Sequence, residues 1–410
     1  MSSEPIERVG NFENIFAHGD DATLSHLVSG MMPKKPSPFS WRNFKQEKLI
    51  FGAIIAAIFA FFFEHAFISN GKTVAFVASG LLILAIVLTA VRVAHHAEIL
   101  AEKVGDPYGT MILTLSAVLV EVLILAIMMT HSPSPDLAKN TIFSAVILDV
   151  NLILGLAALF GGFKHGEQDY NEDSGRVYVA MILTAVGVSM IMPEFVPDAH
   201  WKAWSAFTIV AMIVLYGLFL RMQTNEHSYF FNYSYPEKKR KYEALTKRQM
   251  IDHAAEKDYE STRFSILMLI IGVVTTGALA EVMSKSLMVG MNGSNIPVIF
   301  VALIVATISA SPEILTAMRA AMDNKMQVVI NISLGASLST VILTIPVIEA
   351  IALYTGQEID MALTPAQTVM MVITLVVAYM NVSDGQTNAI EGMMHLILFA
   401  SFIMACSIGL

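Results

Sequence analysis

The chain has 410 residues, of which 55% are hydrophobic and only 14% are charged. A soluble core cannot absorb so much apolar surface, so the composition excludes an ordinary soluble domain and predicts that a lipid bilayer surrounds most of the chain. The net charge of -9 identifies no partner, because in a membrane protein the distribution of charge between loops is more informative than the sum. The single cysteine, Cys406, excludes an intramolecular disulfide.

The N-terminal segment, residues 1–47, is polar and is predicted to lie in the cytoplasm. Residues 1–30 lack the basic start, apolar centre and small-residue cleavage site of a signal peptide. We therefore expect that this end is not exported.

Apolar runs of about 20 residues, each long enough to cross roughly 30 Å of hydrocarbon, recur from residue 48 to the end. They predict an all-α polytopic membrane protein with 11 transmembrane helices. The predicted spans are 48–67, 73–101, 107–130, 140–162, 176–193, 201–221, 263–284, 296–320, 326–355, 365–382 and 387–409.

The loops differ strongly in positive charge. If the N-terminus is cytoplasmic, all lysines and arginines except four lie on that side of the membrane. This bias favours a cytoplasmic N-terminus and, with an odd number of spans, an external C-terminus; a bacterial inner membrane is the expected location. The four exceptions are Lys72, Lys139, Lys202 and Lys285.

One long hydrophilic interruption, residues 222–262, is predicted to be a cytoplasmic linker. It separates a first helix (48–72) and a first group of five helices (73–221) from a second group of five (263–410). Five is odd, so the second group must enter the membrane in the opposite direction, as in the inverted repeats of many transporters. The similar stretches AEILA (97–101) and AEVMS (280–284) support this symmetry.

Two glutamates lie inside predicted spans, at equivalent places in the two repeats. They are Glu121, near the centre of the third span, and Glu313, in the eighth. An ionised carboxylate at this depth costs about 2.5–3.5 kcal/mol on insertion scales, so it is seldom present without a function. The alternative for Glu121 is a protonated side chain hydrogen-bonded to a neighbouring helix. The second buried glutamate favours a functional site.

Pro312 precedes Glu313 and lacks a backbone donor, so the eighth span is predicted to break or kink beside this carboxylate. Ser311 is a candidate cap for the second half-helix. Two facing carboxylates with carbonyl, hydroxyl and amide oxygens suit Ca2+, so Glu121 and Glu313 are the predicted Ca2+ ligands. Burial favours their protonated form and a divalent cation favours their ionised form, which predicts exchange of cation for protons by alternating access.

Four further residues are candidate secondary ligands. Asp149 and Asn151 lie in the fourth span, and Ser309 and Ser337 lie in the second repeat. A structural role is the alternative for Asp149.

Four more carboxylates are candidates for a gate or a proton relay. Glu98 and Glu281 lie near helix ends, where a solvated surface is an equally good interpretation. Asp384 and Glu391 lie at the junction of the last two spans, where Asp384 is also a candidate cap for the last helix.

No phosphate-binding loop, dinucleotide fingerprint or nucleophile elbow is present in the sequence. The chain is therefore predicted to be neither an enzyme nor a cofactor-binding protein, and transport is expected to be driven by an ion gradient. The expected partners are the bilayer, Ca2+ and H+, with no nucleic acid; a monomer and a homo-oligomer fit the sequence equally well.

Four stretches of sequence carry a family resemblance: HHAEILAEKVGDPYG (95–109), SPE (311–313), GASLS (335–339) and SDGQTNAIEG (383–392). They resemble the calcium/cation-proton exchanger (CAX-type) family of the cation/Ca2+ exchanger superfamily, and most closely its bacterial sodium/calcium-proton antiporter branch. The resemblance covers roughly residue 92 to the C-terminus. It implies one helix followed by two inverted five-helix repeats, with Glu121 and Glu313 binding the cation and exchanging protons.

The sequence departs from the family pattern at one pair of positions in each repeat. The common pattern has Gly-Asn four and three residues before each glutamate, whereas this chain has Ala117-Val118 and Ser309-Ala310. Fewer amide oxygens for Ca2+ leave a Na+(K+)/H+ antiporter as an alternative to Ca2+/H+ exchange. A sodium-driven calcium exchanger is a further alternative, and a channel is disfavoured by the paired titratable sites.

Overall fold

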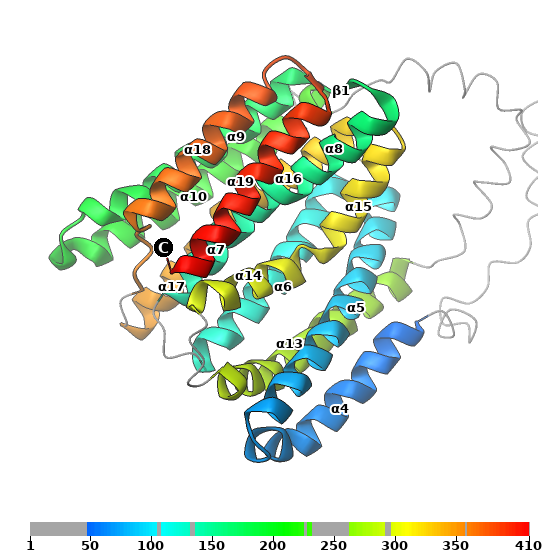
Figure 1. Ribbon diagram of the computed structural model, residues 1–410, viewed down its shortest axis with the longest axis vertical. Coiled ribbons are helices and arrows are strands. Elements are labelled where there is room, and N and C mark those ends of the chain that lie inside the picture. The colour runs from blue at the N-terminus through cyan, green and yellow to red at the C-terminus, as the bar shows by residue number, and fades with distance from the viewer. Residues whose placement is uncertain are drawn as a thin grey trace, which may run out of the picture.

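The computed structural model describes residues 47–104, 108–131, 136–224, 228–231, 262–291, 297–356 and 359–409. These residues are almost entirely helical, and Figure 1 shows the helices running side by side in one bundle. The predicted segment 1–47, apart from Glu47, and most of the predicted linker 222–262 lie outside the described residues.

The first half of the bundle starts at the N-terminal helix and ends before the linker. Its elements are α4 (Lys48–Ser69), α5 (Lys72–Val104), α6 (Tyr108–His131), α7 (Leu137–Ile147), the π-helical segment η1 (Leu148–Ile153), α8 (Leu154–His165), β1 (Gln168–Asp169), α9 (Glu172–Val186), the π-helical segment η2 (Gly187–Ile191), the short 3-10 segments η3 (Met192–Phe195) and η4 (Asp198–His200), α10 (Trp201–Thr224) and the 3-10 segment η5 (Ser228–Phe231).

The second half follows the linker and contains one span that is broken into two helices. Its elements are α13 (Thr262–Met291), α14 (Val298–Ser309), α15 (Ser311–Met322), α16 (Met326–Ser339), the π-helical segment η6 (Thr340–Thr344), α17 (Ile345–Thr355), α18 (Pro365–Asn381), β2 (Gln386–Thr387) and α19 (Ala389–Ile408).

Membrane-length apolar helices dominate the described part of the chain. Eight helices there have the length and composition to cross a membrane, or nine when the bent pair α14–α15 is taken as one span. Two apolar helices are shorter, Thr114–Met129 within α6 and Pro365–Asn381. The sequence-based spans agree with the observed helices to within a few residues at most ends.

The largest difference is at α13, which was predicted to end at residue 284 and continues to Met291. Lys285, which marked the predicted end, forms ion pairs with Glu64 of α4 at 2.9 Å and with Glu281 at 3.0 Å. A neutralised lysine does not interrupt the helix. The expectation of an all-α chain also needs a small correction, because β1 and β2 form an antiparallel pair with Gln168 opposite Thr387.

Burial separates the centre of the bundle from its edge. The span formed by α7, η1 and α8 is almost completely buried, whereas only a small share of α4 and of α10 is buried. Phe61 and Phe62 of α4, for example, are largely exposed, as expected for side chains in contact with lipid. In Figure 1 α4 lies at one edge of the bundle, next to α5.

Candidate functional site

Glu121 lies in the middle of α6 and is buried, with 5% of its surface exposed. Its Oε2 atom accepts a hydrogen bond of 2.8 Å from the hydroxyl of Thr340, the first residue of η6. Its Oε1 atom is buried and has no hydrogen-bond partner among the described residues. The hydroxyl of Thr340, from the second half of the chain, thus holds Oε2 of Glu121, and Oε1 remains available to bind a proton or a cation.

Glu313 lies in the first turn of α15, directly after a break in the span. The axes of the two half-helices differ by 56°, which confirms the break predicted from Pro312. The positive end of the helix dipole of α15 favours a negative charge at this position, a factor that Glu121 lacks in mid-helix. The Oε2 atom of Glu313 is buried without a hydrogen-bond partner in the described part of the chain.

The expectation that Ser311 caps α15 is wrong. Its hydroxyl donates a 2.7 Å hydrogen bond back to the carbonyl of Ile308, and Ala310 occupies the cap position. The break after α14 frees this carbonyl, so the serine satisfies the end of the preceding half-helix instead.

Asp149 brings a third carboxylate to the same region. It lies in η1, and its carboxylate interacts electrostatically with both Glu313 and Glu121. The hydroxyl of Ser337 donates to Asp149 Oδ2 at 3.1 Å, and that of Ser333 donates to its backbone carbonyl at 2.8 Å. Hydroxyls from the second half of the chain therefore contact two carboxylates of the first half, and Glu313 lies within electrostatic reach of both.

Two of the predicted secondary ligands are engaged elsewhere. The amide of Asn151 donates from Nδ2 to the Thr374 hydroxyl at 2.9 Å, while its Oδ1 lies 3.1 Å from His395 Nδ1. The hydroxyl of Ser309 donates to the carbonyl of Ala306 in its own helix at 3.0 Å. Of the four predicted secondary ligands, Asp149 and Ser337 are the two that the structure places together.

The predicted gate or relay residues lie at several places. Glu281 is held in the ion pair with Lys285, and Glu98 is half-buried on α5. Asp384 is exposed, and its Oδ1 accepts from the backbone of Gln386 at 3.1 Å. The expectation that Asp384 caps the last helix is wrong, because the side chain of Asn388 accepts from the first backbone N–H groups of α19.

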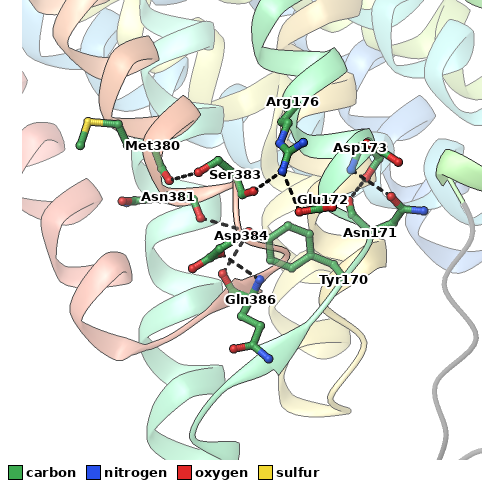
Figure 2. A network of polar contacts seen from close by, with 11 residues as sticks. Tyr170, Asn171, Glu172, Asp173, Arg176, Met380, Asn381, Ser383, Asp384 and Gln386 are labelled. Carbon is green, nitrogen blue, oxygen red and sulfur yellow. Dashed lines mark hydrogen bonds and ion pairs between the residues drawn. The ribbon is translucent and has the colours of Figure 1, made fainter.

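Glu391, the fourth predicted gate residue, lies in the first turn of α19 and interacts electrostatically with Tyr170. Tyr170 belongs to a network of polar contacts between the segment before α9 and the segment after α18 (Figure 2). The hydroxyl of Tyr170 lies 3.2 Å from the carbonyl of Asn381 and 3.1 Å from that of Gln386. Burial, together with the charges of Asp384 and Glu391, raises the pKa of Tyr170, so its hydroxyl remains protonated. It can therefore serve as a donor.

Arg176 completes this connection. It donates to the carboxylate of Glu172 at 2.7 Å and to the carbonyl of Ser383 at 2.6 Å, and Figure 2 shows it between them. With the β1–β2 pair, these contacts fix the junction of α8 and α9 to the junction of α18 and α19.

Chemically, the central carboxylates suit exchange between bound protons and a bound cation. No lysine or arginine forms an ion pair with Glu121, Glu313 or Asp149 in the described part of the chain. The same residues contain no preformed group of three or more His, Cys, Asp or Glu side chains in a metal-binding arrangement. A buried carboxylate without a positive partner is stable when it binds a proton or a cation.

Sequence reasoning did not single out three of the buried polar residues. The hydroxyl of Thr340 contacts Glu121 from 219 positions further along the chain, and no local pattern predicts this contact. Glu349 in α17 and His395 in α19 are 3% and 1% exposed, respectively. The available signal was their position inside apolar spans, which applies to any intramembrane ionisable residue.

Membrane-length helices around unneutralised carboxylates define the class of protein: an integral membrane transporter. The model of the sodium/calcium exchanger protein family matches residues 74–225 and 264–407, and the chain belongs to this family. Its named relatives are transporters, and the chain is not an enzyme.

Two of these relatives have informative names. The sodium-potassium/proton antiporter ChaA of Escherichia coli (strain K12) is 32% identical over 327 residues, which cover 79% of this chain and 87% of that protein. A Ca(2+)/H(+) antiporter of Aphanothece halophytica is 25% identical over 331 residues, covering 78% and 86%, respectively. Among solved structures, native YfkE has the same fold, with a TM-score of 0.63 and 16% identity over 84% of this chain and 99% of that one.

Proposed function

We propose that the protein is a secondary cation/proton antiporter in which Glu121 and Glu313 bind either a cation or protons. One observation carries this proposal: these two buried glutamates, one from each half of the chain, each keep a carboxylate oxygen without a hydrogen-bond partner among the described residues. Asp149 lies within electrostatic reach of both. The names of the antiporter relatives support this function.

The proposed architecture is one N-terminal helix (48–72) followed by two inverted five-helix repeats (73–221 and 263–410), with 222–262 as the linker. The family model matches on both sides of this linker, at 74–225 and 264–407, which supports the division. Each glutamate lies in the second span of its proposed repeat, and the third span of each repeat contains a π-helical segment, η1 or η6. These correspondences favour two repeats of five spans each, which with the N-terminal helix make the proposed eleven spans.

In the proposed mechanism, the carboxylates are never left empty and fully ionised during the conformational change. An uncompensated charge at this depth is unfavourable, so the site changes its access when protons or a cation neutralise it. Thr340 and Ser337 orient Glu121 and Asp149 through their hydroxyls. The coupling of the two fluxes then follows from competition for the same oxygens.

Ca2+ is the first proposed cargo, because a group of carboxylate and hydroxyl oxygens is the ligand set that this hard cation prefers. Na+ or K+ is the second candidate. The name of the 32% identical relative favours it, as does the replacement of both Gly-Asn pairs by residues without side-chain amides. The proposed location is a bacterial inner membrane, with the N-terminus in the cytoplasm and the C-terminus outside.

Transport into proteoliposomes under an imposed pH gradient tests this function. We expect gradient-dependent uptake of 45Ca2+, or of Na+ or K+, with matching movement of protons. Glu121→Gln and Glu313→Gln should each abolish it. The matched control is Glu349→Gln, which changes another buried glutamate with an unpartnered oxygen, on α17. Absence of proton-coupled flux of any of the three cations would refute the antiporter.

A further inference from the structure

A small cavity lies away from the central carboxylates, near the junction of α18 and α19. Its volume is about 10 Å³, which is enough for one water-sized group. The side chains that line it include Glu391, His395, Asn381, Thr387 and Tyr170. The walls are otherwise apolar, so these polar groups define what the cavity can hold.

Three of the lining side chains have polar atoms that are buried without a hydrogen-bond partner among the described residues. They are Glu391 Oε2, His395 Nε2 and Asn381 Nδ2. Glu391 and His395 are four residues apart in α19, so they lie on one face of the helix with neighbouring side chains. Unpartnered buried polar atoms are rare, and three that line one cavity indicate a bound water molecule or ion.

The hydrogen bonds of Asn151 determine which nitrogen of His395 carries the proton. Because Asn151 Nδ2 donates to Thr374, its Oδ1 atom is an acceptor, so the proton lies on His395 Nδ1, 3.1 Å away. In the neutral ring Nε2 then presents its lone pair to the cavity. A carboxylate oxygen and an imidazole lone pair therefore share the cavity, and both are acceptors.

The contacts around this pair resemble those of a metal site. A metal-binding histidine almost always donates its other ring N–H to an oxygen acceptor, as His395 does to Asn151. The other carboxylate oxygen of Glu391 is held by the amide of Asn388 at 3.0 Å, which fixes the orientation of the carboxylate. With the amide of Asn381 reversed, its carbonyl oxygen also becomes available to the cavity.

We propose that this cavity is a second cation site, distinct from the transport site, that binds a divalent transition metal such as Zn2+, Co2+ or Mn2+. Glu391 Oε2 and His395 Nε2 are its two strong ligands, and the amide oxygen of Asn381 is a third, weaker ligand. The imidazole ligand distinguishes this site from the central one, because Ca2+ prefers oxygen ligands alone.

The site has a structural connection to the transport helices. His395 holds Asn151, which lies in η1 two residues after Asp149, and Asn151 in turn holds Thr374 of α18. A bound metal would fix the position of His395 and hence the contact between α19, η1 and α18. We expect slower exchange when the site is occupied, an effect that rests on the proposed antiport function.

Co2+ titration tests the site independently of transport. The protein is purified in detergent without a polyhistidine tag and carries Glu121→Gln and Glu313→Gln, so the central carboxylates do not contribute. We expect the visible absorption of Co2+ to report one site per chain, from which Zn2+ displaces Co2+. Adding Glu391→Gln or His395→Gln should weaken binding by at least about 100-fold, because each removes a direct ligand and the loss of an outer partner alone typically costs about 10- to 100-fold.

Two controls keep the result interpretable. His165→Gln removes a histidine that contacts the carbonyl of Met322 at the end of α15, and Glu349→Gln removes a buried glutamate elsewhere; both should leave Co2+ binding unchanged. Size-exclusion profiles and helical circular dichroism establish that each variant is folded. Absence of saturable Co2+ binding, or equal binding in folded Glu391→Gln and His395→Gln variants, would overturn the proposal. Absence of proton-coupled flux in the wild type, with Co2+ binding retained, would refute only the function proposed above.

Discussion

Glu47 at the start of the first span and Glu121 at the centre of the bundle are both buried carboxylates, but their neighbours differ. Glu47 is paired with Arg92, whose Nε atom donates to it at 3.0 Å, and its Oε2 lies 3.3 Å from His96 Nε2. Glu121 has one hydroxyl partner, Thr340, and no ion pair among the described residues. Glu47 is neutralised by the protein itself, whereas Glu121 needs a proton or a cation.

The ion pair of Glu47 predicts a role in stability, whereas the absence of an ion pair at Glu121 among the described residues favours a role in transport. Burial acts to raise the pKa of Glu47, but the adjacent His96 and Arg92 outweigh it and bring the pKa to about 2. A carboxylate held in its ionised form cannot exchange protons at neutral pH, so its role is to join the start of α4 to α5. The central carboxylates have no ion pair among the described residues, and under the proposed function they exchange protons and a cation.

The largest effect is expected from Glu121→Gln and Glu313→Gln. Each should reduce proton-coupled cation flux by at least about 100-fold, equivalent to about 2.7 kcal/mol, because an amide cannot bind and release the proton. Neither should lower the melting temperature of the purified protein, because each change removes an unpaired buried carboxylate. A variant that unfolds and also loses flux would contradict the assignment of these residues to transport.

A smaller effect is expected from Pro312→Ala. The substitution restores a backbone donor at the break between α14 and α15, so the helix can straighten and move Glu313. We expect flux to fall about tenfold, or about 1.4 kcal/mol. The matched control is Pro365→Ala at the start of α18, where the proline also lies in the first helical turn and the Thr364 cap remains. Equal losses in the two variants would show that the break has no specific role.

Thr340→Val tests the hydroxyl that holds Glu121. Removing this hydrogen bond is expected to weaken the apparent affinity for the cation about fivefold, since a buried hydrogen bond contributes about 1 kcal/mol. Thr344→Val is the control, because Thr344 lies in the same π-helical segment and its hydroxyl has no partner among the described residues. The comparison is made by flux at a series of cation concentrations.

The smallest effect on transport, but the clearest on stability, is expected from Glu47→Gln. Its charged contacts should contribute about 1–2 kcal/mol, which for a chain of 410 residues corresponds to a melting temperature lower by about 1–2 °C at neutral pH. Flux per folded molecule should be unchanged.

The pH dependence of this difference has a definite sign. The pKa of Glu47 is lowered from 4.5 to about 2 in the folded protein, so its contribution is fully present above pH 4.5 and is lost as the pH falls toward 2. The melting temperatures of wild type and Glu47→Gln should therefore converge over this range. A constant difference across the range would mean that the glutamine acts through packing alone.

Several features of the fold could be predicted because they depend on local composition. Apolar runs determine the spans, and Pro312 removes a backbone donor wherever it lies in a helix, so the break beside Glu313 was predictable. The prediction that Glu121 and Glu313 act together rests on their equivalent positions in two predicted groups of five helices.

Other features depend on contacts between distant segments. The π-helical segments η1 and η6 shift the backbone hydrogen bonds without a marker in composition, and they place Asp149 and Thr340 beside the glutamates. Ser337 reaches Asp149 across 188 positions, and His395 reaches Asn151 across 244. Spacing rules apply to residues within one helix, so they do not predict contacts between such distant residues. The sequence alone therefore could not show that Asn151 contacts His395 of α19 and not the central carboxylates.

The most direct test of the account is proton release on cation binding. Purified protein in detergent and weak buffer is titrated with Ca2+, and separately with Na+ and K+, while a pH indicator records released protons. We expect the transported cation to release protons from wild type and none from the Glu121→Gln/Glu313→Gln variant. Cation binding to wild type without proton release, or equal release from the double variant, would contradict the claim that cation and protons share these two carboxylates.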